Sequence, residues 1–299
     1  MKMTTEQSNV IPVSGGLVVP RSERIIGAIL VQAGRLTSDG TERIMKLQRE
    51  QGLRFGDAGI QLGLITAEDL SLALARQFDC PYLLQGESGV SEQVVAAYNP
   101  FGQQALSLSA LRGQLMLRRF DSANGGRTLA VVSAGRHDGR SFLASNLAVV
   151  FSQLGLKTLL IDADMRHPTQ HDLFGLDNRN GLSAMLAGRS SADAAIQRIA
   201  GLPSLWIMPA GAQPPNPLEL LARPLFPAIL TSLVPEFEII LLDSPASSEY
   251  ADAQSISAQA GAALIVARRN VSRIAQVRSV AGTVSDSGAT VVGTVLNDY

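Results

Sequence analysis

Short apolar runs recur through the second half of the chain, and most of them are separated by stretches long enough to form a helix. The runs cover residues 128–133, 158–161, 204–208, 239–242, 262–267 and 290–296. Each run is apolar at successive positions rather than at every second one, which is typical of strands buried on both faces of a parallel sheet. We therefore predict an α/β fold, in which helices cover both faces of a mostly parallel sheet and ligands bind at the carboxyl ends of the strands.

The first third of the chain has a different pattern, a sequence repeat with a period of 29 residues. Within the second copy, Thr66 precedes Asp69 as a helix cap would, and Leu70, Leu74 and Gln77 fall on one helical face. Each copy is therefore predicted to form a short helix, a turn and a longer helix. Two glycines and a glutamine mark the repeat, as Gly27, Gly34 and Gln48 and then as Gly56, Gly63 and Gln77.

These two patterns divide the chain into parts. Residues 1–21 are polar without a sustained period, and we interpret them as a flexible tail before a small helical domain at residues 22–84. A proline and glycines interrupt the pattern that follows, so residues 85–104 are expected to form a linker. Residues 105–299 are then expected to form the α/β domain.

Composition narrows the class of protein. Apolar residues make up 46% and charged residues 17% of the 299 residues, which excludes a long disordered or coiled-coil protein. The apolar stretches fall far short of the roughly 18 residues that a spanning helix needs, and the start lacks an apolar signal core, so a soluble cytoplasmic protein is expected. A formal net charge of −1 gives no general attraction to nucleic acid, and the single cysteine, Cys80, cannot form an internal disulfide.

A loop typical of a phosphate-binding site follows the first predicted strand. It leads into an apolar helix, so backbone N–H groups and the helix N-terminus would face a bound phosphate. The loop matches the P-loop pattern GxxxxGK[ST] at Gly139 and Ser141, but it has Ala134 for the first glycine and Arg140 for the lysine. A turn of this kind need not bind a ligand. If it does, the residues that bind the nucleotide are Ala134, Gly135, Arg136, His137, Asp138, Gly139, Arg140, Ser141 and Phe142.

Three carboxylates stand at the ends of two other predicted strands. Asp162 and Asp164 follow the run 158–161, and Asp243 follows the run 239–242. A carboxylate in such a place is costly unless it is solvated, hydrogen-bonded or bound to a cation. Mg²⁺ in nucleotide sites uses one or two carboxylates with a P-loop hydroxyl, so we predict a metal site formed by Ser141, Asp162 and Asp243. The alternative is that the carboxylates only cap the strands.

Three motifs in the second half resemble those of a known family. The segment Asp162-Ala163-Asp164-Met165-Arg166 resembles a second Walker motif, and the segment LLDSP around Asp243 resembles a Walker B motif. The string MPAGAQPPNPLELL at residues 208–221 is similar to the signature PAGxxPPNPxELL. Together these motifs resemble the kinase domain of bacterial tyrosine kinases of the polysaccharide chain-length-determinant type, P-loop proteins related to the MinD/ParA ATPases. The resemblance covers residues 105–299.

This resemblance implies that ATP and Mg²⁺ are the cofactors of a tyrosine autokinase that controls exopolysaccharide chain length with a transmembrane chain-length-determinant protein. That partner would recruit the chain to the inner face of the cytoplasmic membrane. Arg140 takes the role of the P-loop lysine, and Asp162 supports catalysis and the metal. Asp164 either orients or deprotonates the tyrosine hydroxyl, or organises Mg²⁺ as a second carboxylate. Arg166 either positions an anion or pairs with an acid.

The sequence departs from the family pattern at three places. Arg140 is the first. The second is the segment 106–112, where the family carries an acid and two arginines that pack one subunit against the next, and where only Arg112 remains. The third is the tail, in which Tyr299 alone has the position of a phosphoacceptor and is equally consistent with an unmodified terminus. A homo-oligomer is thus one expectation among others. The alternatives to the kinase are a catalytically weak ATP-binding switch and a MinD/ParA-like ATPase.

The second copy of the N-terminal repeat also carries a motif, Arg54-Phe55-Gly56-x-x-Gly59-Ile60-x-x-Gly63 with leucines and a glutamine after it. It is similar to the repeated motif at the N-terminus of type II secretion and pilus ATPases, some of which bind cyclic di-GMP. The first copy differs, with Ile25 for the arginine and Thr41 for a leucine. A structural or partner-docking role is the alternative. The resemblance assigns cyclic di-GMP binding to Arg54, Gly56, Gly63, Leu70, Leu74 and Gln77.

Overall fold

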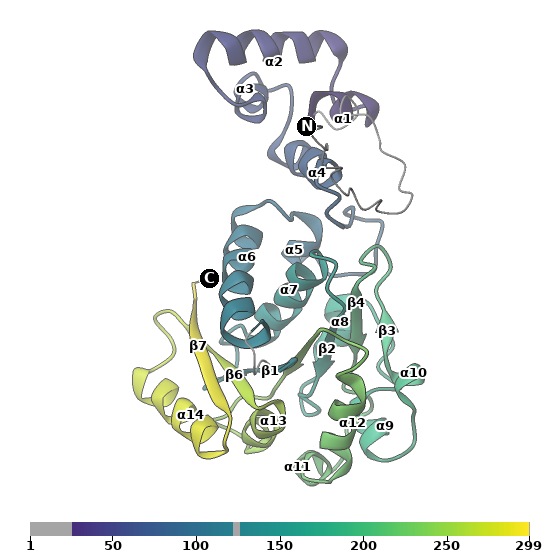
Figure 1. The fold of residues 1–299 in the computed structure, drawn as a ribbon, viewed down its shortest axis with the longest axis vertical. Helices are drawn as coiled ribbons and strands as arrows, with labels where there is room; N and C mark the ends of the chain where they lie inside the picture. Colours follow the sequence, from purple (N-terminus) through teal and green to yellow (C-terminus); the bar gives the residue numbers. More distant parts are fainter. Residues whose placement is uncertain (1–25, 122–125, 299) are drawn as a thin grey trace, which may run out of the picture. The chain divides into compact units, whose positions relative to one another are not determined.

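The computed structural model describes residues 26–121 and 126–298, so the expected tail at residues 1–21 and the terminal Tyr299 lie outside the described residues. The chain forms two compact units that divide between Gln77 and Phe78. The described part of the first unit consists of helices, and the second unit is an α/β domain (Figure 1).

The first unit has the two copies of a short helix, a turn and a longer helix that the repeat predicts. The helices are α1 (Ile26–Gln32), α2 (Ser38–Gln51), α3 (Phe55–Gln61) and α4 (Ala67–Gln77). A threonine directly precedes and caps each of the two longer helices. The side chain of Thr37 accepts a hydrogen bond from the backbone of Gly40 at 3.1 Å, while Thr66 accepts one from the backbone of Asp69 at 3.1 Å and donates its own N–H to the Asp69 carboxylate at 3.0 Å.

The repeated glycines stand at the turns between the helices. Gly34 has φ of 68° and Gly63 has φ of 63°, a conformation that disfavours other residues, so the turn geometry explains why both copies carry glycine here. The turns bring the apolar faces together in one small core, formed by Ile29, Leu30, Leu36, Ile44, Ala58, Ile65 and Ala73.

The second unit is built on a seven-stranded sheet with the order β3-β4-β2-β5-β1-β6-β7. The six predicted strands are present and pair in parallel. The remaining strand, β3, is an antiparallel strand of two residues at the edge of the sheet and is too short to show a sequence pattern. The strands are β1 (Thr128–Ser133), β2 (Thr158–Asp162), β3 (Gln197–Arg198), β4 (Leu205–Met208), β5 (Ile239–Asp243), β6 (Ala262–Arg268) and β7 (Thr290–Asn297).

Two hydrophobic cores lie on opposite faces of the sheet. In β1, Leu129 and Val131 enter one core, and Ala130 and Val132 enter the other, which explains why the strand is apolar at every position. The first core is covered by α5 (Val95–Tyr98), α6 (Gln103–Leu115), α7 (Arg140–Ser152) and α8 (Gln170–Phe174). The second is covered by α9 (Leu182–Leu186), α10 (Ala192–Ala195), α11 (Pro217–Leu221), α12 (Leu225–Leu233), α13 (Asp252–Ala260) and α14 (Ile274–Asp286).

The segment expected to be a linker differs in the structure, because it packs against α7 as part of the second unit. The amide of Asn146 accepts a hydrogen bond from Ala96 N at 2.9 Å and donates one to Gln93 O at 3.0 Å. Gln153 donates to Ala96 O at 2.9 Å. Pro100 and Gly102, which suggested a linker, lie in the turn between α5 and α6, and the boundary between the units lies earlier, at Gln77.

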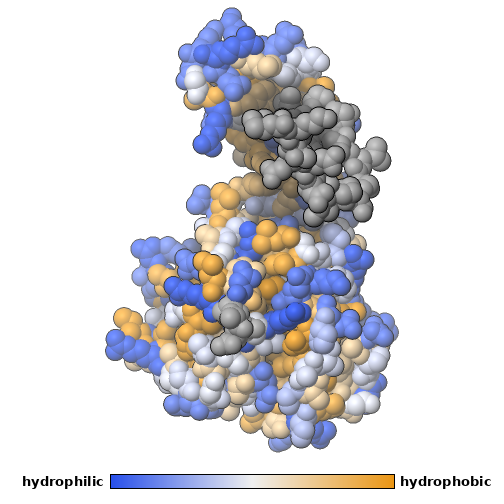
Figure 2. Space-filling view, in the orientation of Figure 1, coloured by the Kyte–Doolittle hydropathy of each residue, from blue (hydrophilic) through white to orange (hydrophobic). Residues whose placement is uncertain are grey.

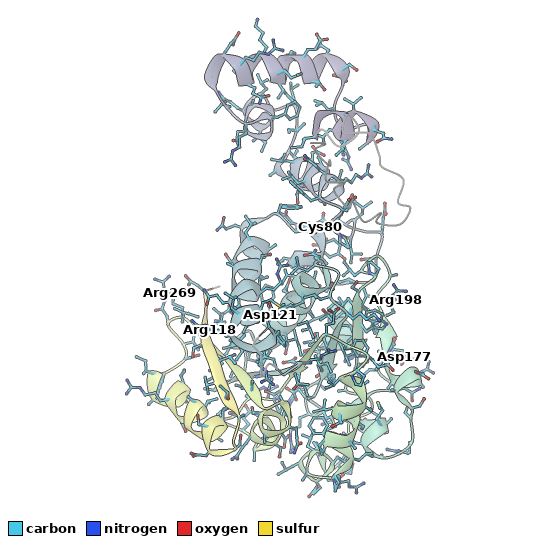
Figure 3. The ribbon with its side chains drawn as sticks, viewed as in Figure 1. Cys80, Arg118, Asp121, Asp177, Arg198 and Arg269 are labelled. Carbon is cyan, nitrogen blue, oxygen red and sulfur yellow. The ribbon has the colours of Figure 1, made fainter. Side chains whose placement is uncertain are left out.

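Arginines that precede β1 bind backbone carbonyl groups. After α6, the chain continues in a π-helical turn, η2 (Met116–Phe120). From this turn, Arg119 donates to Thr128 O through Nε at 3.0 Å and through Nη2 at 2.9 Å, and to Ala260 O at 2.9 Å. Arg118, labelled in Figure 3, reaches Val292 O at 3.4 Å. Arg112, the one basic residue that remains in the segment 106–112, donates to Val150 O within the same chain.

Some large apolar side chains stay exposed in this region. Leu106 on α6 and Leu117 on η2 are 50% and 77% exposed. Figure 2 shows apolar side chains gathered in patches between polar ones on the drawn face of the second unit. Within the described residues, every helix is too short or too polar to cross a membrane.

Candidate functional site

A cavity of about 610 Å³ lies at the carboxyl ends of the central strands, where the sequence analysis expects a ligand. Its walls come from the loop after β1, from the segment after β2 and from the segment after β5. Of the nine predicted nucleotide-binding residues, six line it: Arg136, His137, Gly139, Arg140, Ser141 and Phe142. Ala134 and Asp138 lie beneath the surface and are each 2% exposed.

The buried carboxylate of Asp138 stabilises the conformation of the loop through hydrogen bonds. It accepts hydrogen bonds from Gly135 N at 2.8 Å and from the hydroxyl of Ser272 at 2.9 Å. Asn297 donates to the backbone carbonyl of Asp138 at 3.0 Å, which ties the loop to the end of β7. Gly139, at the N-terminus of α7, has φ of 91°, a conformation that favours glycine at this position of the motif.

Asp162 and Asp243 lie side by side under the cavity, because β2 and β5 pair in register at these two residues. Both side chains are fully buried. Burial, together with the neighbouring charge of Asp243, raises the pKa of Asp162 well above its usual value. The Asp162 carboxylate accepts three backbone hydrogen bonds, at 3.1, 3.0 and 3.0 Å, from Asp164, Thr169 and Gln170.

Of the three aspartates at the strand ends, Asp164 is the one that lines the cavity, which Asp172 and Glu249 also line. One of its oxygens accepts backbone hydrogen bonds from Arg166 at 3.2 Å and from His167 at 2.9 Å. Burial raises its pKa, and the hydrogen bond from His167 and the charge of Arg140 partly offset this rise.

Arg140 joins the strand ends, and each of its three guanidinium nitrogens has a protein partner. Nε donates to Asp243 at 3.2 Å, Nη2 donates to Asp164 at 3.2 Å, and Nη1 donates to the Ser133 hydroxyl at 2.8 Å. The side chain is 9% exposed. The structure therefore brings together the predicted catalytic residues, but the guanidinium is turned toward the carboxylates.

Gln170, which the sequence analysis missed, completes this network. Its Nε2 donates to Asp243 at 2.8 Å and to the backbone carbonyl of Ser141 at 3.2 Å. The side chain is fully buried, and its Oε1 has no hydrogen-bond partner among the described residues. A glutamine eight residues after a strand carries no sequence signal for this role, since its place depends on how α8 packs.

The three predicted metal ligands do not fit a directly bound Mg²⁺ in this arrangement. Both oxygens of Asp162 accept backbone N–H groups, and those of Asp243 accept from Arg140 and Gln170. Ser141 lines the cavity, but the two aspartates do not. In the described part of the chain, no group of three or more His, Cys, Asp or Glu side chains is arranged to hold a metal ion.

Arg166 pairs with an acid, which was one of its two predicted roles. Its Nε donates to Asp252 at 2.6 Å, and its guanidinium carbon lies 4.0 Å from the centroid of the Tyr250 ring. The hydrogen bond from Arg166 to Asp252 also raises the pKa of the guanidinium. Asp252 and Tyr250 come after β5, and no sequence pattern indicates either contact.

The string at residues 208–221 runs beside α9 and does not line the cavity. Leu182 N donates to Pro209 O at 2.9 Å, and the Ser183 hydroxyl donates to Ala212 O at 2.7 Å. At the other end of this contact, Gln213 donates to the backbone carbonyl of Arg166 at 3.3 Å. The string thus connects α9 to the segment that carries Asp164.

The first unit has a cavity of its own, of about 810 Å³, around the first copy of the repeat. Gln77 is the one residue of the six predicted for cyclic di-GMP that lines it, together with its repeat equivalent Gln48. The Oε1 atom of Gln77 is buried and has no hydrogen-bond partner among the described residues. Gly56 is instead covered by Leu70, whose Cδ2 would stand 2.6 Å from a Cβ at that position.

Comparison with known proteins finds similar sequences, although no family model matches the chain. The putative tyrosine-protein kinase CapB of Staphylococcus aureus is 33% identical over 171 residues, which are 57% of this chain and 75% of CapB. The tyrosine-protein kinase Wzc of Salmonella typhimurium is 32% identical over 205 residues, which are 69% of this chain. The chain spans only 28% of the length of Wzc.

Comparison with solved structures also finds tyrosine kinases. The kinase domain of the Escherichia coli tyrosine kinase ETK superposes with a TM-score of 0.66 and 29% identity over 69% of this chain and 79% of that domain. The chimerical protein CapA2B2 superposes with a TM-score of 0.65 and 27% identity, and the match covers 76% of this chain and 98% of the chimera. The septum site-determining protein MinD of Pyrococcus horikoshii, solved with Mg-ADP, superposes with a TM-score of 0.51. It is 26% identical in sequence, and the match covers 57% of this chain and 70% of MinD.

Proposed function

Because the chain belongs to the family of bacterial tyrosine-protein kinases that includes CapB, we propose that its second unit transfers a phosphoryl group from ATP to tyrosine in a capsule or exopolysaccharide system. The names of the relatives support the reaction. The loop after β1 and the cavity beside it support the site, because they lie where a P-loop protein binds its nucleotide.

The residues of the cavity have distinct roles in this proposal. Backbone N–H groups of residues 134–142 and the N-terminus of α7 bind the phosphates, and Arg136 and Arg268 add positive charge at the rim. Asp164 accepts the proton of the tyrosine hydroxyl, since among the three aspartates at the strand ends it is the one that lines the cavity. No step is assigned to Mg²⁺, because the oxygens of Asp162 and Asp243 are already engaged.

The position of Asp164 at the wall of the cavity carries the proposal, and replacing its carboxylate tests it. The purified chain is incubated with Mg-ATP, and phosphotyrosine is mapped by tandem mass spectrometry. We expect phosphate on a tyrosine, with Tyr299 the first candidate, and its loss in Asp164→Asn while nucleotide binding persists. Asp193→Asn, an exposed carboxylate on α10, is the matched control and should label as the wild type does. Labelling that persists in Asp164→Asn would contradict the role of this residue.

An ATP-binding switch without phosphoryl transfer is the second candidate function. The hydrogen bonds from Arg140 to Asp164 and Asp243 favour it, because they occupy the proposed acceptor of the proton. This candidate predicts nucleotide binding without phosphotyrosine under any condition. A MinD/ParA-like ATPase would share the fold, but the string at residues 208–221 speaks against it.

A membrane chain-length-determinant protein is the partner we propose, acting at the inner face of the cytoplasmic membrane. The similarity to a chimera named for both CapA and CapB supports an arrangement of two components. Labelling that appears only when the partner's cytoplasmic segment is added would favour the kinase over the switch. A homo-oligomer needs a surface other than Arg112, because this side chain is bound to Val150 O of its own chain.

For the first unit we propose a docking or sensory role, with cyclic di-GMP as the ligand to test. The unpaired Oε1 of Gln77 in a cavity supports a bound polar ligand. Isothermal titration with cyclic di-GMP is the measurement, with Arg54→Ala and Gln77→Ala as variants. If the wild type releases heat on binding cyclic di-GMP and both variants do not, the sensory role is supported. If the wild type shows no heat of binding, the docking role remains as the proposal for this unit.

A further inference from the structure

The guanidinium of Arg140 lies between two carboxylates, one at the end of a strand and one just after the end of the neighbouring strand. It donates to Asp243, at the end of β5, and to Asp164, just after β2, and both distances are 3.2 Å. Two carboxylates at the ends of neighbouring strands, close to a P-loop hydroxyl, are the setting in which a nucleotide-binding protein holds a divalent cation. In this chain a side chain supplies the positive charge at that place.

Arginine suits this position and lysine does not. A planar guanidinium presents N–H groups in several fixed directions and can therefore span two carboxylates and a hydroxyl, whereas an ammonium group is a compact point charge. Ser133 accepts the third hydrogen bond, at 2.8 Å. Because the pairs are almost completely buried, pulling the guanidinium away would leave two carboxylates without a compensating charge in the interior, which is strongly unfavourable.

We propose that Arg140 takes the place of the divalent cation at this site, so that nucleotide binds in the loop after β1 without Mg²⁺. The proposal rests on the proposed nucleotide-binding function. It also assigns a cause to the arginine in the P-loop motif: the residue is a built-in cation that holds the two strand ends together, not a weaker copy of the lysine.

Other groups bind the phosphates while Arg140 stays on the carboxylates. The loop N–H groups and the N-terminus of the 13-residue helix α7 face the cavity. Arg268 lines the same cavity and donates to the backbone carbonyl of His137 at 3.3 Å, at the tip of the loop. Arg136 lines the cavity as well, with its side chain 44% exposed and 3.9 Å from Glu249.

The test compares nucleotide affinity with and without the metal. A fluorescent ADP analogue is titrated into the full chain in excess EDTA and in excess Mg²⁺. For the wild type we expect dissociation constants within about threefold of each other, and for Arg140→Lys we expect binding at least about tenfold tighter with Mg²⁺. Arg269→Lys, an exposed arginine paired with Asp298, is the matched control and should behave as the wild type.

The outcomes separate the inference from the function on which it rests. Wild-type binding that weakens about tenfold or more in EDTA overturns the inference and leaves the nucleotide-binding function standing. Absence of nucleotide binding in both buffers overturns the proposed function and the inference together. Arg140→Lys that remains indifferent to Mg²⁺ also overturns the inference.

A second measurement does not depend on nucleotide. Electron paramagnetic resonance of Mn²⁺ mixed with the nucleotide-free chain should detect no ion bound to the wild type, because Arg140 occupies the carboxylates. Arg140→Ala should bind one Mn²⁺. Mn²⁺ bound at this site in the wild type would overturn the inference even if the variant failed to fold.

Discussion

Arg119 illustrates how much single side chains contribute away from the cavity. Its guanidinium satisfies two buried carbonyl groups, one at the start of β1 and one at the end of α13. A lysine at this position reaches one carbonyl at most, so we expect Arg119→Lys to lower the free energy of unfolding by about 1–3 kcal/mol. Urea denaturation followed by the fluorescence of Trp206, the single tryptophan, measures the second unit.

The neighbouring Arg118 provides the control for this prediction. It makes one long hydrogen bond, at 3.4 Å, so Arg118→Lys should change the free energy of unfolding by less than about 0.5 kcal/mol. Equal effects of the two substitutions would mean that charge, rather than the geometry of the hydrogen bonds, explains the arginines before β1.

The two raised carboxyl pKa values predict how stability varies with pH. Asp162 and Asp164 have higher pKa values in the folded than in the unfolded chain, so the folded state binds more protons above about pH 4. Raising the pH from there through the raised pKa values therefore favours the unfolded state. We expect the free energy of unfolding of the second unit to fall over this range, and Asp162→Asn to flatten the dependence. Asp193→Asn should keep it.

For single residues, the sequence predicts where the charged side chains of the site lie but not which residues they contact. Asp162 and Asp243 were found because they end apolar strands, and the register of β2 and β5 sets them side by side. The partners Gln170 and Asp252 could not be predicted, because no periodicity reports which helix will pack over a strand end. The bonds of Arg140 depend on those same neighbours.

At the scale of elements, the backbone of α9 and the backbone of residues 208–221 approach each other closely. A Cβ on Gly181 would overlap the carbonyl oxygen of Pro209 and stand 2.5 Å from Gly211 N. Since both neighbours are backbone, Gly181→Ala should lower the free energy of unfolding by at least about 2 kcal/mol, measured by urea denaturation.

Gly282 is the matched control for this substitution. It lies inside α14, and a Cβ there would meet no atom within 4 Å. We expect Gly282→Ala to raise the free energy of unfolding by about 0.5–1 kcal/mol, because alanine is the better helix former. Destabilisation by both alanines would indicate that space around Gly181 is not the reason for its glycine.

Elements were predictable where a pattern extends over several turns or residues. The repeat gave both pairs of helices in the first unit, and the apolar runs gave the six parallel strands. The segment 85–104 was misread because short helices and turns contain the same prolines and glycines as linkers do. Its burial depends on Asn146 and Gln153, whose partners lie 50 or more residues away in sequence.

For the whole molecule, the boundary between the units predicts which fragment folds. Residues 78–299 contain the complete second unit, so this fragment should unfold at the same urea concentration as the full chain when Trp206 is the probe. Residues 105–299 lack Val94, Ala96 and Ala97, which are fully buried in the first core of the sheet. We expect that fragment to lose at least about 3 kcal/mol or to fail to fold. If the two fragments had equal midpoints of urea denaturation, residues 85–104 would be a linker, as the sequence predicts.

The order of the strands also decides when the site can form during synthesis. Arg140 and Asp243 are 103 residues apart, and β1 lies between β5 and β6, which come from the last third of the chain. A ribosome that has released β1 and α7 has produced a loop whose arginine has no strand-end partners yet. The first unit, with its local contacts, is complete long before this stage. Nascent chains that end before β6 should therefore depend on chaperones and should not retain nucleotide, because one or both of the strands that flank β1 would still be absent.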